Sequence, residues 1–134
     1  MTVALTQDGI DFGIVTNDGE AALKFYRDTF GLKHEGDMPF PVGGTIHRLW
    51  CGGSLIKIVV PDRASEIHPA RGPVAKATGF RYLTISVSNI QELTDDCRTG
   101  GYNVVVEPTE IRPGVTIAMV DDPDGNRVEF MQTS

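Results

Sequence analysis

Four ionisable side chains recur at matching places in the sequence. Asp11 and Tyr82 lie 71 residues apart, and Lys57 and Glu129 lie 72 residues apart. Each occupies a run in which apolar and polar residues alternate, so in a β-strand its side chain lies on the face opposite the apolar residues. A carboxylate that burial brings toward neutrality can abstract the proton alpha to a carbonyl, while an ammonium or a phenol stabilises the enolate. These residues predict either acid–base catalysis or a charge-paired network with a structural role alone.

A second set of polar and aromatic residues is predicted on the same strand faces. If Gly52-Gly53 forms a two-residue turn, Arg48 and Trp50 share the face of Lys57. Cationic side chains bind carboxylates or phosphates, and a tryptophan ring stacks on the flat part of a ligand. The predicted ligand-binding residues are therefore Arg48, Trp50, Thr84 and Arg127. A turn one residue longer would instead bring His47 to this face in place of Arg48.

An internal repeat with a period of about 71 residues must position these side chains. In each copy a strand, at 10–15 or 81–86, leads into a helix with an N-cap and capping-box spacing, predicted at Asn17 and Ser88. The helices are expected to end at glycine, with Gly31 closing the first. A hairpin follows in each copy, and a further strand completes the order β-α-β-β-β.

The predicted fold class is therefore α+β, with tandem β-α-β-β-β modules. The chain is predicted to be a single domain over residues 1–134. Its first module covers 9–60 and its second covers 79–133, and a proline-containing linker covers 61–78. The additional strand of the first module is predicted around 33–35 or 40–42, two alternatives between which the sequence pattern does not decide.

Composition excludes several classes of partner. The formal net charge is −6, from 12 Lys and Arg against 18 Asp and Glu, and the basic residues form no cluster, so nucleic acid is not an expected partner. No apolar run approaches the roughly 20 residues of a membrane-spanning helix, and the N-terminus has no signal-peptide pattern, so a cytoplasmic protein without a membrane partner is expected. Cys51 and Cys97 lack zinc or redox motifs and are predicted to be reduced.

The repeat and its motifs resemble the vicinal-oxygen-chelate superfamily, which includes glyoxalases, bleomycin-resistance proteins and extradiol dioxygenases. The resemblance rests on Phe25-Tyr26 in the first helix, Phe30-Gly31-Leu32 at its end, and residues 122–130 (DPDGNRVEF) near the C-terminus. It implies that the strands of the two modules form a curved mixed sheet cup for a small-molecule ligand and one divalent metal. By the family's pattern, four metal ligands come from the first and last strands of each module.

The metal positions that the resemblance implies fall on Asp11, Lys57, Tyr82 and Glu129. Only Glu129 matches the family's usual ligand types, and an ammonium at Lys57 would repel a cation. No metal is therefore assigned. A divalent metal is the alternative, held by Glu129, Asp11 and His47 if the hairpin adopts the other register. The missing ligands disfavour glyoxalase and dioxygenase activity.

Two functions remain from different classes. The first is an atypical lyase or isomerase acting on a small carbonyl or hydroxy-acid compound, with Glu129, Asp11, Lys57 and Tyr82 as catalytic residues. The second is a drug- or metabolite-sequestering binding protein of the bleomycin-resistance type. In both cases the resemblance allows modules to pair within one chain or across a dimer, and a homodimer is expected. His34 and His68 are predicted to be surface residues without a role in the site.

Overall fold

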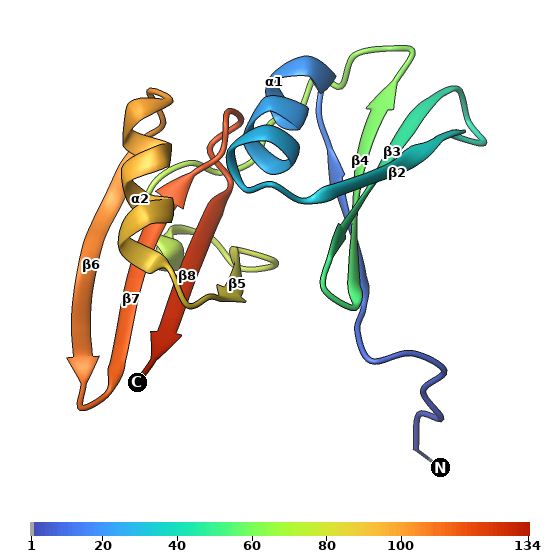
Figure 1. Ribbon diagram of the computed structural model, residues 1–134. Helices are drawn as coiled ribbons and strands as arrows, with labels where there is room; N and C mark the ends of the chain where they lie inside the picture. Colours follow the sequence, from blue (N-terminus) through green and yellow to red (C-terminus); the bar gives the residue numbers. More distant parts are fainter. Residues whose placement is uncertain (1) are drawn as a thin grey trace. The chain divides into compact units, whose positions relative to one another are not determined.

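The computed structural model describes residues 2–134, which divide into two compact units (Figure 1). One unit extends to Glu66, and the other runs from Ile67 to Ser134. Each contains one four-stranded sheet and one helical segment that follows its first strand. Within the part of the chain that the structure describes, no helix is both long and apolar enough to cross a lipid bilayer.

The elements repeat in the same order in both units, which confirms the tandem β-α-β-β-β prediction. Those of the N-terminal unit are β1 (Asp11–Val15), α1 (Gly19–Leu23), the π-helix η1 (Lys24–Thr29), β2 (Lys33–Pro39), β3 (Gly44–Cys51) and β4 (Ser54–Pro61). Those of the C-terminal unit are the 3-10 helix η2 (Val74–Lys76), β5 (Tyr82–Ser86), α2 (Ile90–Thr99), β6 (Val104–Arg112), β7 (Val115–Asp121) and β8 (Arg127–Thr133).

Both sheets are mixed and have equivalent strand orders, β1-β4-β3-β2 and β5-β8-β7-β6. In each, the first strand pairs in parallel with the last, and the remaining pairs are antiparallel. The parallel pair requires a crossover, because a short hairpin cannot connect two parallel strands. The first and last strands of a module thus become neighbours although they are far apart in sequence.

Both N-caps lie one residue later than predicted, and of the two only that of the first helix makes a side-chain cap hydrogen bond. Asp18, not Asn17, caps α1, and its side chain accepts a hydrogen bond from the Ala21 amide at 3.1 Å. Asn89, not Ser88, occupies the N-cap position of α2. The Ile90 amide at that end donates to the side chain of Gln132 at 2.9 Å, so a residue remote in sequence satisfies one of the amide donors that have no partner within the helix.

Aromatic packing forms the core of the N-terminal unit. The Phe25 and Tyr26 side chains are fully buried, and their ring centroids lie 4.7 Å apart with edge-to-face geometry. Phe30 packs against both rings. Adjacent residues of a regular α-helix point about 100° apart, yet both rings are buried here. The segment is a π-helix, in which the Phe30 amide donates to the Phe25 carbonyl.

Burial follows the predicted alternation only in part. Ile56, Ile58, Val128 and Phe130 are buried, as expected for residues facing the helices, but Leu55 and Val59 on the opposite face of β4 are buried as well. The Gly52-Gly53 turn has two residues, since Cys51 pairs with Ser54 and Arg48 pairs with Lys57. His47 pairs with Ile58 and therefore lies on the helix-facing side of the sheet. The alternative register, with His47 in place of Arg48, does not form.

The second half of the segment expected to be a linker is held against the C-terminal unit. The Arg81 guanidinium donates to the carbonyl oxygens of Ala70, Pro73 and Val74 at 2.8 to 3.1 Å. Arg127 donates to the Gly72 carbonyl at 3.0 Å. These arginines supply the hydrogen bonds that a short irregular segment cannot make internally.

Candidate functional site

An ion pair lies on the face of the N-terminal sheet opposite its helix. Lys57 of β4 places its Nζ 3.3 Å from Oδ2 of Asp11 on the parallel strand β1, and both side chains are about two-fifths exposed. Arg48 is the cross-strand partner of Lys57, and Trp50 is the partner of Leu55 on the same face. An ion pair this exposed contributes only a few tenths of a kcal/mol to about 1 kcal/mol of stability, so it is not a strong structural requirement.

Trp50 adds an unpartnered donor to this face. Its indole Nε1 is buried and has no hydrogen-bond partner among residues 2–134. Buried indole N–H groups usually have a partner, because leaving one unsatisfied costs roughly 1 to 3 kcal/mol. The N-terminal unit thus presents two cations, a carboxylate and an indole with an unmet hydrogen bond.

The C-terminal unit buries a carboxylate in the equivalent position. Glu129 of β8 is 9% exposed and pairs with Thr84 of β5. The Thr84 hydroxyl donates to Oε1 of Glu129 at 2.7 Å. Tyr82, two residues before Thr84 on the same strand face, is half exposed. This arrangement combines an oriented carboxylate with a phenol that solvent can reach.

Arg127 differs from its predicted role in ligand binding. Its Nε lies 2.8 Å from Oδ1 of Asp121, and both side chains are largely buried. Its Nη2 is bound to the Gly72 carbonyl. Because these donors hold β7 and residue 72 in place, we assign Arg127 a structural role.

The family's metal positions in this chain do not fit a divalent cation. In the N-terminal unit, the Lys57 ammonium already lies against the Asp11 carboxylate, where a metal would need a second anionic or neutral donor. In the C-terminal unit, Glu129 accepts its hydrogen bond from a threonine hydroxyl, and the other position is a phenol. His47, the alternative ligand, is on the opposite sheet face from Lys57. We therefore derive no chemistry through a metal at these positions.

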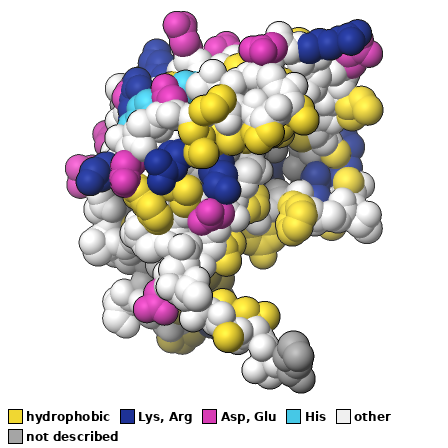
Figure 2. All heavy atoms as spheres, turned by 90° about the vertical axis from the view of Figure 1, so that its right-hand side faces the viewer, with side chains coloured by type: hydrophobic (Ala, Val, Ile, Leu, Met, Phe, Trp, Pro, Cys, Tyr) yellow, Lys and Arg dark blue, Asp and Glu magenta, His cyan; other side chains and the backbone are white. Residues whose placement is uncertain are grey.

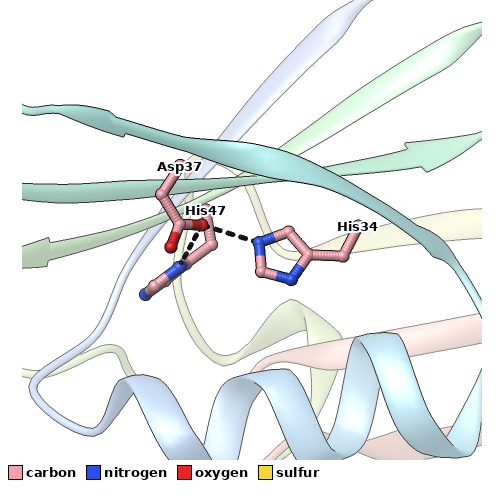
Figure 3. A group of neighbouring side chains, drawn as sticks. All are labelled: His34, Asp37 and His47. Atoms are coloured by element: carbon pink, nitrogen blue, oxygen red, sulfur yellow. Dashed lines mark hydrogen bonds and ion pairs between the residues drawn. The ribbon is translucent and has the colours of Figure 1, made fainter.

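Sequence reasoning missed a second cluster, made of His34, Asp37 and His47 (Figure 3). Oδ1 of Asp37 lies 2.6 Å from Nε2 of His34 and 2.7 Å from Nδ1 of His47. His34 and Asp37 would lie on opposite faces of a regular strand, but the register of β2 shifts between them, and Gly36 has a φ of +76°. This irregularity is not visible in the alternation of residue types.

The electrostatics of Asp37 reflect these contacts. Partial burial raises the pKa of its carboxyl. The hydrogen bonds from His47 and His34 together lower that pKa by a larger amount, so the net pKa lies below the ordinary value. Asp37 is therefore an anion at neutral pH, positioned between two imidazole rings.

Comparison with known proteins identifies the family. Residues 9–130 match the sequence profile of the Glyoxalase/Bleomycin resistance protein/Dioxygenase superfamily. The chain belongs to this superfamily. The match extends across both β-α-β-β-β modules, and it confirms the resemblance drawn from the repeat and the DPDGNRVEF motif.

Two relatives are described as lactoylglutathione lyases, one of them as a probable one. A lactoylglutathione lyase of Neisseria meningitidis is 28% identical over 114 residues, covering 84% of this chain and 81% of that protein. A probable lactoylglutathione lyase of Synechocystis is 42% identical over 57 residues, covering 42% of this chain. That match spans 44% of the Synechocystis protein, less than half of its length.

Solved structures support the fold. A glyoxalase family protein from Bacillus cereus superposes with a TM-score of 0.81 at 17% identity, covering 98% of this chain and 96% of that one. A glyoxalase I variant from Zea mays superposes with a TM-score of 0.75 at 21% identity, covering 92% of this chain and 44% of that one. At these identities the likeness establishes the fold alone.

Proposed function

We propose that this chain is a metal-independent lyase or isomerase that acts on a small carbonyl or hydroxy-acid compound, with Glu129 as its general base. The observation that carries the proposal is the buried Glu129 carboxylate, oriented by the Thr84 hydroxyl at 2.7 Å. A general base needs a defined position relative to the proton that it abstracts, and packing with one directed hydrogen bond supplies that position. The relatives named lactoylglutathione lyase support the lyase class.

The proposed reaction begins with removal of a proton alpha to a carbonyl by Glu129. The electron pair of the broken C–H bond moves toward the carbonyl oxygen, which becomes an enolate. Tyr82 is the proposed donor to that oxygen, because it shares the strand face of Thr84 and is half exposed. Return of the proton at another position completes an isomerisation, and loss of a β-substituent completes an elimination.

The N-terminal unit carries ligand-binding groups of its own. Lys57 and Arg48 are neighbouring cations suited to the carboxylate or phosphate of a small ligand. Asp11 orients Lys57 through their ion pair. Trp50 offers an aromatic surface beside them.

The test is turnover of a panel of 2-hydroxy acids and 2-oxoaldehyde thiol adducts by chelator-treated protein. We expect Glu129→Gln to lower turnover by about 100- to 10,000-fold, the usual contribution of a general base. The matched control is Glu110→Gln, an exposed carboxylate of β6, which should retain full turnover. Turnover that requires an added divalent metal, or that survives Glu129→Gln, would contradict the proposal.

The second candidate function is sequestration of a ligand without chemistry, and the unpartnered indole of Trp50 favours it. The chain has a single tryptophan, so its fluorescence reports on this face alone. Under this function bleomycin, the drug in the family's description, is expected to quench Trp50 fluorescence and to be recovered chemically unchanged. The Arg48→Gln variant should then weaken binding if the drug occupies this face.

A further inference from the structure

The cluster of His34, Asp37 and His47 lies within the N-terminal unit. His47 pairs with Ile58 on the helix-facing side of the N-terminal sheet, whereas Lys57 and Arg48 point to the other side. Figure 3 shows the two imidazole rings converging on the Asp37 carboxylate above the helical segment. A ligand of this cluster would therefore not occupy the sheet face that carries Lys57 and Arg48.

We propose that His34, Asp37 and His47 form a binding site for a divalent transition-metal ion of the Zn²⁺ type. One ligand atom from each residue lies within 4.8 Å of the others. Two imidazole nitrogens and one carboxylate oxygen are a donor set suited to zinc and to other ions that imidazole binds well. With tetrahedral geometry and bonds of about 2.0 Å, ligand atoms lie about 3.3 Å apart, so the side chains need only small shifts to accept an ion.

Surrounding structure decides which ring nitrogens are available. A Cβ at Gly19, the first residue of α1, would lie 3.6 Å from Nε2 of His47, so the helix packs closely against that edge of the ring. The Nδ1 atom of His47 faces Asp37 instead. The three side chains are 17%, 23% and 46% exposed for His47, His34 and Asp37, so an ion can reach them from solvent.

The three side chains of the cluster are partly exposed. Figure 2 shows histidine side chains at the surface, beside acidic and basic ones. Partial exposure allows a metal to keep a water molecule in the fourth coordination position, as three-ligand zinc sites do.

The positively charged Arg27 contacts the cluster and competes with a metal ion for His34. Its Nη1 lies 3.4 Å from Nδ1 of His34, and a guanidinium can only donate hydrogen bonds. That contact favours the tautomer with the proton on Nε2, the nitrogen that must lose its proton to bind a metal. Arg27 must therefore turn away on metal binding, which its partly exposed side chain allows. Replacing Arg27 with glutamine should consequently tighten metal binding.

Titration of the tag-free protein with Co²⁺ alone, followed by displacement with Zn²⁺, tests this inference. One saturable Co²⁺ per chain is expected, with visible d–d absorption and without the thiolate charge-transfer band that a cysteine ligand would give. His34→Gln, Asp37→Asn and His47→Gln should each abolish saturable binding. His68→Gln is the matched histidine control, and Glu129→Gln is the control for the proposed base; both should bind as the parent protein does.

A thermal-unfolding measurement gives a second readout. Zn²⁺ should raise the melting temperature of the parent protein but not that of His34→Gln, because an ion that binds only the folded state stabilises it. If His47→Gln fails to fold, the more exposed His34 and Asp37 variants decide the question. Binding that persists in His34→Gln, binding lost in Glu129→Gln, or the absence of saturable Co²⁺ binding would overturn the proposal. Loss of turnover in Glu129→Gln with unchanged Co²⁺ binding would separate the two sites.

Discussion

At the scale of single residues, burial and hydrogen bonding give similar side chains different tasks. Arg48 lies across a strand pair from Lys57 and donates a hydrogen bond to the Glu35 carbonyl at 3.3 Å, whereas Arg127 is largely buried and bound to both Asp121 and the Gly72 carbonyl. Both were predicted to bind ligand on the basis of residue type and strand face. Only the contacts distinguish an arginine that can meet a ligand from one that holds the fold together.

The cysteines offer a prediction at this scale. Burial, with a smaller effect from Asp96, raises the pKa of Cys97 from its ordinary value of 9.0 to about 11. Since the thiolate is the reactive form, Cys97 should not react with a disulfide reagent at pH 8 in the folded protein, whereas the half-buried Cys51 should react slowly. The measurement is the time course of thiol modification, with Cys51→Ser isolating Cys97.

The same shift predicts how stability depends on pH. Below pH 9 the Cys97 thiol is protonated in the folded and unfolded states, and the stabilisation that comes from its raised pKa in the folded state is fully present. Between about pH 9 and 11 the unfolded state loses its proton more readily, so the free energy of unfolding falls as pH rises. In the Cys51→Ser background, urea titrations at pH 8 and pH 10.5 should show this loss, and it should shrink in Cys97→Ala. Equal pH dependence with and without Cys97 would count against it.

At the scale of elements, the short first helix depends on its ends and on its π-turn. The helix α1 has five residues, too few to be stable by helix propensity alone. Asp18 accepts a hydrogen bond from an amide at its start, and the aromatic rings of η1, which follows directly, are buried in the core. Capping and packing together therefore determine where this crossover sits.

Removal of the cap should have a measurable cost. Asp18→Ala is expected to lower the free energy of unfolding by about 1 kcal/mol, and Asp18→Asn should retain most of it, because asparagine caps a helix equally well. Glu20→Ala, an exposed position in the same first turn, is the control and should change stability by less than about 0.5 kcal/mol. Urea unfolding followed by circular dichroism measures all three. An Asn variant as unstable as the Ala variant would argue that the cap is not the cause.

At the scale of the whole molecule, the chain consists of two units that each hold one module. The N-terminal unit carries the cations Arg48 and Lys57, and the C-terminal unit carries the buried Glu129, although the net charge of the chain is −6. Global charge therefore argues against nucleic acid but does not identify a small ligand. The nature of the ligand depends on local groups.

The size of the units leads to a prediction about fragments. A segment of about 60 residues buries only about 60% of the surface that its unfolded chain exposes, so its stability is marginal. Residues 67–134 expressed alone should show a broad melt at low temperature or no cooperative transition. Differential scanning calorimetry of the fragment and of the full chain makes the comparison. A sharp transition at the temperature of the full chain would show that this unit needs nothing beyond itself.

Sequence alone determined the order of elements, the repeat, the apolar face of each strand and the residues that recur at equivalent places. These features depend on local periodicity of two or 3.6 residues and on turn glycines such as Gly31 and Gly52, so they are readable without tertiary contacts. Even the pairing of Arg48 with Lys57 followed from the length of one turn.

Tertiary structure decided the rest, because it depends on contacts between residues remote in sequence. The Gln132 side chain at the start of α2, the Arg127 bonds to Asp121 and residue 72, and the Thr84 hydroxyl on Glu129 all join separate elements. The β2 irregularity that brings His34 and Asp37 together with His47 interrupts the very alternation from which faces are predicted. Periodicity assigns a residue to a face of its strand, but only the folded chain shows which residues contact its side chain there.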